Sequence, residues 1–202
     1  MLTLLKQLVY PTVEYNSVLW NPTDPTLIDS LEAIQRNFTR KIESPNLPPN
    51  HDYWDRLKTF KLYSMQRRRE RYSILYVWKV LHDLYPNPGL HLNTTTSDHT
   101  IHPNEGIQLD AHQRRGFTPK HNNNPPAWLD HCSVLSSCCK LYNCLPIELR
   151  QPVPADKEPN FPEFKKKVDE WLAKIPDQPS CSGRPKIAAT NSILDQLQYR
   201  ER

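Results

Sequence analysis

Apolar residues recur at helical spacing in two separate stretches of this chain. In the first stretch they lie four, three, four and four residues apart, at Leu27, Leu31, Ile34, Phe38 and Ile42. In the second they lie three, four, three and four residues apart, at Phe161, Phe164, Val168, Trp171 and Ile175. Such intervals return to one face of an α-helix, so each set predicts a helix with an apolar stripe.

Residues that typically begin helices precede both stretches. Asp24 stands directly before Pro25, which suits an N-cap aspartate followed by a proline in the first turn. Asn160 and Glu163 resemble the capping pair of a second helix start. Both helices are therefore predicted from their ends as well as from their apolar spacing.

The stretch LYSMQRRRERYSILYVWKVLHDLY, from Leu62 to Tyr85, predicts a long helix. Ser64 is a suitable N-cap, and the residues after Tyr72 are apolar almost all round. Because a helix of that kind is buried on several sides, we expect it to be the central helix of a first domain. A short helix is predicted just before it, at about 53–60.

Composition favours helices joined by stiff connectors, since the chain has 20 prolines and only 4 glycines. We expect a mainly α fold. Its expected parts are a helical domain at 1–85, an irregular connector rich in His, Pro and Asn at 86–126, a small helical module at 127–178, and a polar, mobile tail at 179–202. The connector allows one hairpin, around 108–120.

An arginine block opens the long helix, at Arg67, Arg68, Arg69 and Arg71. Positive charge in a first helical turn opposes the helix dipole, so this placement favours an outside anion such as backbone phosphate. The simpler alternative is that arginine is a good helix former and that Glu70 partly compensates the charge. A second, weaker basic face is formed by Arg36, Arg40 and Lys41, and such faces are most often only solvated.

The net charge of +4 permits a polyanionic partner without requiring one. Cys132, Cys138, Cys139 and Cys144 lack the paired ligand turns of a zinc site, and we interpret them as free thiols. Neither a secretion signal nor an apolar run long enough to span a membrane is visible, so we expect an intracellular protein. We expect no metal, no small-molecule substrate and no catalytic residue in this chain.

Five blocks of the sequence, taken in order, carry a resemblance to a known protein family. They are LVYPTVEYNSVLWNP, LEAIQRNFTRKI, DYWDRLKTFKLYSMQRRRERYSILYVWKVLHDL, KLYNCLPIELR and FPEFKKKVDEWLAKIPDQP. Together they resemble the C-terminal part of reverse transcriptases from non-LTR (LINE-type, jockey-like) retrotransposons. The blocks follow the order of that family and reach from Leu8 to about Pro179. The resemblance implies a thumb-like helical bundle and a post-thumb segment.

In that family the fingers and palm lie upstream, and the palm aspartates hold divalent metal ions such as Mg²⁺. This sequence contains no Asp-Asp pair, so the resemblance implies a part of an RNA-directed DNA polymerase that is not catalytic by itself. It would grip a template–primer duplex through its phosphate backbone, in a nuclear or cytoplasmic ribonucleoprotein. The alternatives are a truncated or exapted protein-interaction module and a relic reading frame without activity.

Overall fold

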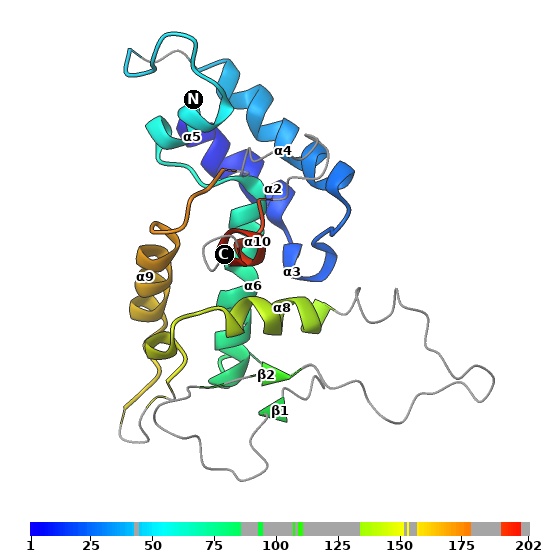
Figure 1. The fold of residues 1–202 in the computed structure, drawn as a ribbon, viewed down its shortest axis with the longest axis vertical. Coiled ribbons are helices and arrows are strands. Elements are labelled where there is room, and N and C mark those ends of the chain that lie inside the picture. The colour runs from blue at the N-terminus through cyan, green and yellow to red at the C-terminus, as the bar shows by residue number, and fades with distance from the viewer. Residues whose placement is uncertain are drawn as a thin grey trace, which may run out of the picture. The chain divides into compact units, whose positions relative to one another are not determined.

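A computed structural model describes most of the helical part of the chain (Figure 1). The described residues are 1–42, 45–85, 93–94, 107, 109–110, 134–151, 153, 157–178 and 191–198. The fold is mainly α, as the sequence predicts. The chain divides into two compact units: unit 1 comprises Met1–Tyr72 and Lys174–Arg202, and unit 2 comprises Ser73–Ala173.

Unit 1 is built from helices of both chain ends. Its elements are α1 (Leu2–Leu4), the π-helical η1 (Leu5–Val9), α2 (Tyr10–Glu14), α3 (Ser17–Trp20), α4 (Pro25–Arg40), α5 (Tyr53–Phe60), the first half of α6 (Met65–Leu81) and α10 (Ile193–Gln198). The predicted helix start holds, because the Asp24 carboxylate accepts hydrogen bonds from the amides of Thr26 and Leu27, at 2.7 and 3.4 Å.

The apolar core of unit 1 joins the N-terminal helices to α5 and to the start of α6. It consists of Leu5, Tyr10, Tyr53, Leu57, Leu62 and Met65. Helix α4 contributes mainly polar residues to the interior, namely Glu32, Gln35 and Thr39. Its apolar stripe is partly turned outward, since Leu27 is 56% exposed and Ile34 is 40% exposed. The predicted helix is therefore present, but its polar side chains are the buried ones.

Unit 2 is organised around the second half of α6. Its other elements are α8 (Val134–Asn143), the 3₁₀ helix η2 (Ile147–Leu149), α9 (Phe161–Leu172) and the strands β1 (Asn93–Thr94) and β2 (Leu109–Asp110), which pair antiparallel. The Trp78 ring of α6 stacks on the Phe164 ring of α9, with centroids 4.8 Å apart and planes at 13°. This contact agrees with the expected packing role of the α9 stripe, whose Phe164 and Val168 are buried.

The compact units differ from the expected domain ranges. The division falls inside α6, after Tyr72, and not at 85. Within the expected tail, residues 193–198 form the helix α10, and Ile193 is fully buried. Of the expected hairpin at 108–120, only β2 is described, and it pairs with residues 93–94. The remaining residues of the connector and tail lie outside the described part.

The predicted N-cap of α9, Asn160, can be tested by substitution. Asn160 Oδ1 accepts a hydrogen bond from the Glu163 amide at 3.2 Å. Asn160→Ala leaves that amide without its acceptor, so we expect unit 2 to lose about 1 kcal/mol, and Asn160→Gly to lose only a few tenths. Hydrogen exchange of the first-turn amides of α9 measures both. No loss for Asn160→Ala would show that the cap does not contribute.

Candidate nucleic-acid interface

The arginine block of α6 is turned largely into unit 1. Arg67 and Arg69 are both 0% exposed. Arg67 donates to the main-chain carbonyls of Ile175 at 3.4 Å and Pro176 at 2.8 Å, and its Nε lies 3.9 Å from an Asp177 oxygen. Arg69 donates from Nε to Asn21 Oδ1 at 2.9 Å. Burial therefore removes both residues from the phosphate contacts that the sequence predicts, as long as unit 1 keeps this fold.

The other two arginines of the block are partly buried. Arg68 forms two hydrogen bonds with the Glu14 carboxylate and lies 3.8 Å above the centre of the Tyr10 ring. Burial alone would lower the pKa of Arg68, but the Glu14 hydrogen bonds and charge outweigh it and raise that pKa. Arg71 lies 6.0 Å from the Tyr72 ring centre. The charge of Arg68 is thus matched by an acid of the same unit.

The acidic group that lies at the positively charged start of α6 comes from unit 1 itself. The buried Glu32 of α4 accepts hydrogen bonds from the amides of Met65 at 3.0 Å and Gln66 at 3.3 Å, and from the Tyr53 hydroxyl. Burial raises the pKa of Glu32, although these hydrogen bonds oppose the rise. Ser64 Oγ accepts from the Arg67 amide at 3.1 Å, which confirms Ser64 as the N-cap. Glu32 of unit 1 therefore accepts the first amides of α6 and lies at the positive end of the helix dipole.

A second set of arginines remains at the surface of unit 1, where α5 packs on the end of α4. Arg40 and Lys41 are exposed, and the Arg36 side chain is 39% exposed. Arg56 of α5 lies beside them but is itself buried, with 7% of its surface exposed, and donates from Nε to Thr39 Oγ1 at 3.4 Å. Both Arg36 and Arg56 lie over the Tyr53 ring, at 5.6 and 5.8 Å from its centre.

In the α4/α5 basic cluster (Arg36, Arg40, Lys41 and Arg56), the charges of Arg36 and Arg40 repel that of Arg56. Burial is the largest cause that lowers the pKa of Arg56, and the neighbouring charges of Arg40 and Arg36 lower it further. The nearby Asp52 opposes this effect, and Asp29 forms an exposed ion pair with Arg36 at 2.6 Å. Like charges held together in this way favour the binding of an anion.

Sequence reasoning found three members of the cluster and missed Arg56. Arg36, Arg40 and Lys41 follow one another on a predicted helix, but Arg56 belongs to the next helix. Only the packing of α5 against α4 brings it to the others. The predicted short helix at 53–60 was the one sequence signal that involved Arg56. Its register places Arg56 on one side of α5, but it does not show which other helix packs against that side.

Other candidate chemistry is sparse in the described part of the chain. Cys138 and Cys139 are buried free thiols and Cys144 is partly buried, whereas Cys132 lies outside the described residues. The described residues contain no group of three or more His, Cys, Asp or Glu side chains arranged to hold a metal ion. Among the described helices, none combines the length and apolar character needed to cross a bilayer.

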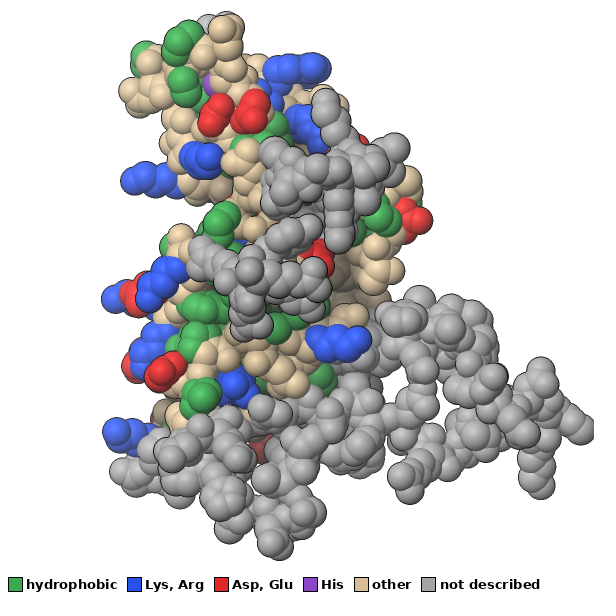
Figure 2. Space-filling view, in the orientation of Figure 1, with side chains coloured by type: hydrophobic (Ala, Val, Ile, Leu, Met, Phe, Trp, Pro, Cys, Tyr) green, Lys and Arg blue, Asp and Glu red, His purple; other side chains and the backbone are tan. Residues whose placement is uncertain are grey.

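Comparison with known proteins adds no relative. No protein-family model matches the sequence, and no curated protein and no solved structure is significantly similar to it. The interpretation of the site therefore depends on its own charges and contacts. On the face shown in Figure 2, the coloured Lys and Arg side chains are spread out and several lie beside acidic ones.

Proposed function

We propose that this chain is the post-palm segment of a retrotransposon-type RNA-directed DNA polymerase and that it grips template–primer duplex through the phosphate backbone. It would do so with the α4/α5 basic cluster, next to the missing fingers and palm, and without catalysis of its own. The observation that carries the proposal is the crowding of the exposed Arg40 and the partly exposed Arg36 at the end of α4, beside the buried Arg56 of α5. The resemblance of the five sequence blocks supports it independently.

The contact would be electrostatic and positional. Arginine presents a planar fork of donors that matches two phosphate oxygens, and it keeps its charge at all physiological pH values. Neutralising phosphates releases condensed counterions, so the affinity falls steeply as salt rises. Cation–π contacts of the Arg36 and Arg56 guanidinium groups with the Tyr53 ring place them near each other before any ligand arrives. Little side-chain ordering would then remain to oppose binding.

Charge reversal at the exposed members tests the proposal. We expect Arg36→Glu/Arg40→Glu/Lys41→Glu to weaken binding to a labelled primer–template duplex by about 10²-fold or more near 100 mM salt. The slope of log affinity against log salt should fall by about 3, because each of the three side chains would no longer neutralise a phosphate. Fluorescence anisotropy across a salt series measures both quantities.

A matched control separates this cluster from a general effect of charge. Lys165→Glu/Lys166→Glu/Lys167→Glu makes the same charge change on the exposed side of α9 in unit 2. We expect it to retain most of the affinity and the wild-type salt slope. If both triple variants lose affinity equally, the α4/α5 basic cluster is not a specific interface, and unchanged binding in the first variant would reject the proposal.

A protein-interaction module is the alternative function, and one observation favours it. Several large apolar side chains of unit 1 are exposed, with Tyr15 at 74%, Leu19 at 66%, Leu8 at 62% and Leu27 at 56%. A partner that covers apolar surface would bind with little dependence on salt. The salt series that tests duplex binding therefore also distinguishes the two functions.

A further inference from the structure

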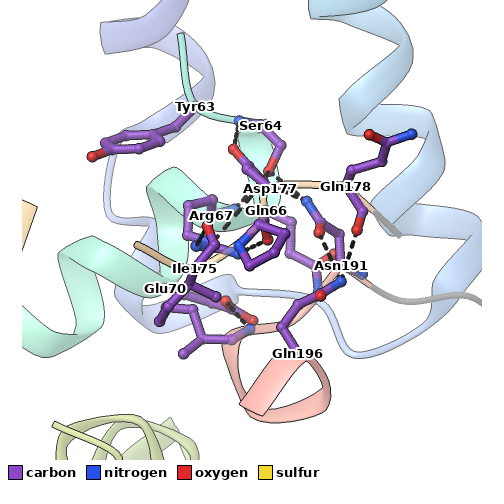
Figure 3. Close-up of polar contacts among 12 residues, drawn as sticks. Tyr63, Ser64, Gln66, Arg67, Glu70, Ile175, Asp177, Gln178, Asn191 and Gln196 are labelled. Carbon is purple, nitrogen blue, oxygen red and sulfur yellow. Dashed lines mark hydrogen bonds and ion pairs between the residues drawn. The ribbon is translucent and has the colours of Figure 1, made fainter. Parts of the chain in front are cut away.

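The carboxylate of Asp177 lies among hydrogen-bond donors at the start of α6 (Figure 3). It accepts from the Ser64 amide at 2.7 Å, from Ser64 Oγ at 2.7 Å and from Asn191 Nδ2 at 2.5 Å. Its Oδ1 also lies 3.9 Å from Arg67 Nε. A main-chain amide, a hydroxyl, a side-chain amide and a guanidinium thus surround one anionic group, all within unit 1.

Arg67 is incompletely satisfied in this arrangement. Its side chain is 0% exposed, and its Nε has no hydrogen-bond partner among the described residues. The 3.9 Å separation from Asp177 exceeds hydrogen-bond length, so the carboxylate compensates the buried charge only by electrostatic attraction. A buried cation usually has closer anionic oxygens than this. The donor at Nε therefore points toward an anion site that a carboxylate fills imperfectly.

A phosphate group suits this set of donors. It carries more charge than a carboxylate and directs oxygens tetrahedrally, so one oxygen can approach Arg67 while others take the Ser64 donors. The site also adjoins the N-terminal end of the 17-residue helix α6, where the dipole favours anions. The Asp177 side chain is still 18% exposed, which places the site at the edge of the fold.

The C-terminal segment (174–178 and 191–198) that supplies Asp177 is attached by the buried side chains of Ile175 and Ile193 and by a series of polar contacts. The Asn191 amide donates to Gln66 Oε1 at 3.0 Å, and the Ile193 amide donates to Glu70 Oε2 at 2.8 Å. Gln196 Nε2 donates to the Gln178 carbonyl at 2.8 Å, which ties the two parts of the segment together. Local opening of one such segment costs less free energy than unfolding of the whole unit.

We propose that the start of α6 is a phosphate-binding site whose occupant in this structure is Asp177. Phosphate displaces the carboxylate, loosens the C-terminal segment and exposes Arg67. The arginine block would then become a second contact to a polyanion after the segment opens. The source of the phosphate, a nucleic-acid backbone, is the part that rests on the proposed function, whereas the site itself does not.

Hydrogen exchange of the wild-type chain tests the displacement. Inorganic phosphate should speed exchange of the amides at Asn191 and Ile193 about 10-fold relative to sodium chloride at equal ionic strength. A primer–template duplex should do the same if nucleic acid is the source. Slower or unchanged exchange with both probes would overturn the proposal. Faster exchange with phosphate alone would support the site and assign it to free phosphate.

Substitution of the occupant gives the second test. Asp177→Asn removes the competing charge, so we expect calorimetry to show inorganic phosphate bound at least 10-fold more tightly than by wild type. Glu158→Gln makes the same charge change at an exposed position in unit 2 and should leave the affinity unchanged. Equal affinities in the two variants would overturn the proposal.

Asn191→Ala is the charge-neutral companion. It removes one donor to Asp177 and one to Ser64 Oγ, at 2.5 and 3.0 Å, without altering net charge. If Asp177→Asn fails to fold, judged by circular dichroism, this variant should still show faster exchange at Ile193 before any ligand is added. An exchange rate at Ile193 equal to that of the wild type would contradict the proposal.

The triple variant Arg36→Glu/Arg40→Glu/Lys41→Glu distinguishes this site from the α4/α5 basic cluster. If it loses duplex binding but keeps the phosphate response at Asn191 and Ile193, the two sites are separate.

Discussion

Glu32→Ala is expected to destabilise unit 1 by about 4 kcal/mol. The substitution leaves three buried donors, the amides of Met65 and Gln66 and the Tyr53 hydroxyl, without their acceptor. Each such donor costs about 1–3 kcal/mol when it stays buried and unpaired. It also removes one of the two acids, Glu32 and Asp177, that lie at the positive end of α6. Urea denaturation measures the lost free energy of unfolding, and hydrogen exchange of the α6 amides shows whether the loss falls in unit 1.

Two controls make the result specific to Glu32. Asp29→Ala removes an exposed acid from the same helix, and we expect a loss below about 1 kcal/mol, because exposed ion pairs contribute little. Glu32→Gln keeps one oxygen acceptor and should cost about half as much as the alanine variant. If Glu32→Ala denatures together with Asp29→Ala, the internal cap does not stabilise α6.

Glu70 is expected to make unit 1 less stable as pH rises from 5 to 8. Burial is the main cause that raises the pKa of Glu70 to about 7 from an ordinary value of 4.5, although the Ile193 amide, Ser192, Arg67 and Arg69 oppose it. The folded state therefore holds this proton more tightly than the unfolded state does. Protonation stabilises the fold, and that stabilisation is complete below the unfolded pKa and is lost as pH rises through about 7.

The comparison with Glu70→Gln isolates this group, because glutamine stays neutral at every pH. We expect the stability of the wild type relative to Glu70→Gln to fall by about 2.5 kcal/mol between pH 5 and pH 8. Chemical denaturation at a series of pH values gives the difference. A flat difference for Glu70→Gln would mean that Glu70 is solvated or already ionised when folded.

The helices themselves were readable because their signals are local. An N-cap and the apolar positions that follow it lie within a few residues of one another, so Asp24, Ser64 and Asn160 mark real helix starts. The same locality found Arg36, Arg40 and Lys41 as one basic face. Arg56 was missed because its contact with that face depends on how two helices pack, which no spacing along the chain encodes.

Which charged side chains are buried depends on long-range packing, and the sequence pattern predicted this incorrectly for the arginine block. An arginine block reads as a surface feature because charged side chains are seldom buried. Arg67 is nevertheless buried, because carbonyls and a carboxylate from more than 100 residues away surround it. In the same way, Glu32 became an interior cap although its helix has an apolar stripe. The sequence by itself determined which residues form helices and which ends carry charge. Only the tertiary structure decided which charges meet an acid inside unit 1 and which remain exposed to bind an outside anion, because that pairing depends on distances in space.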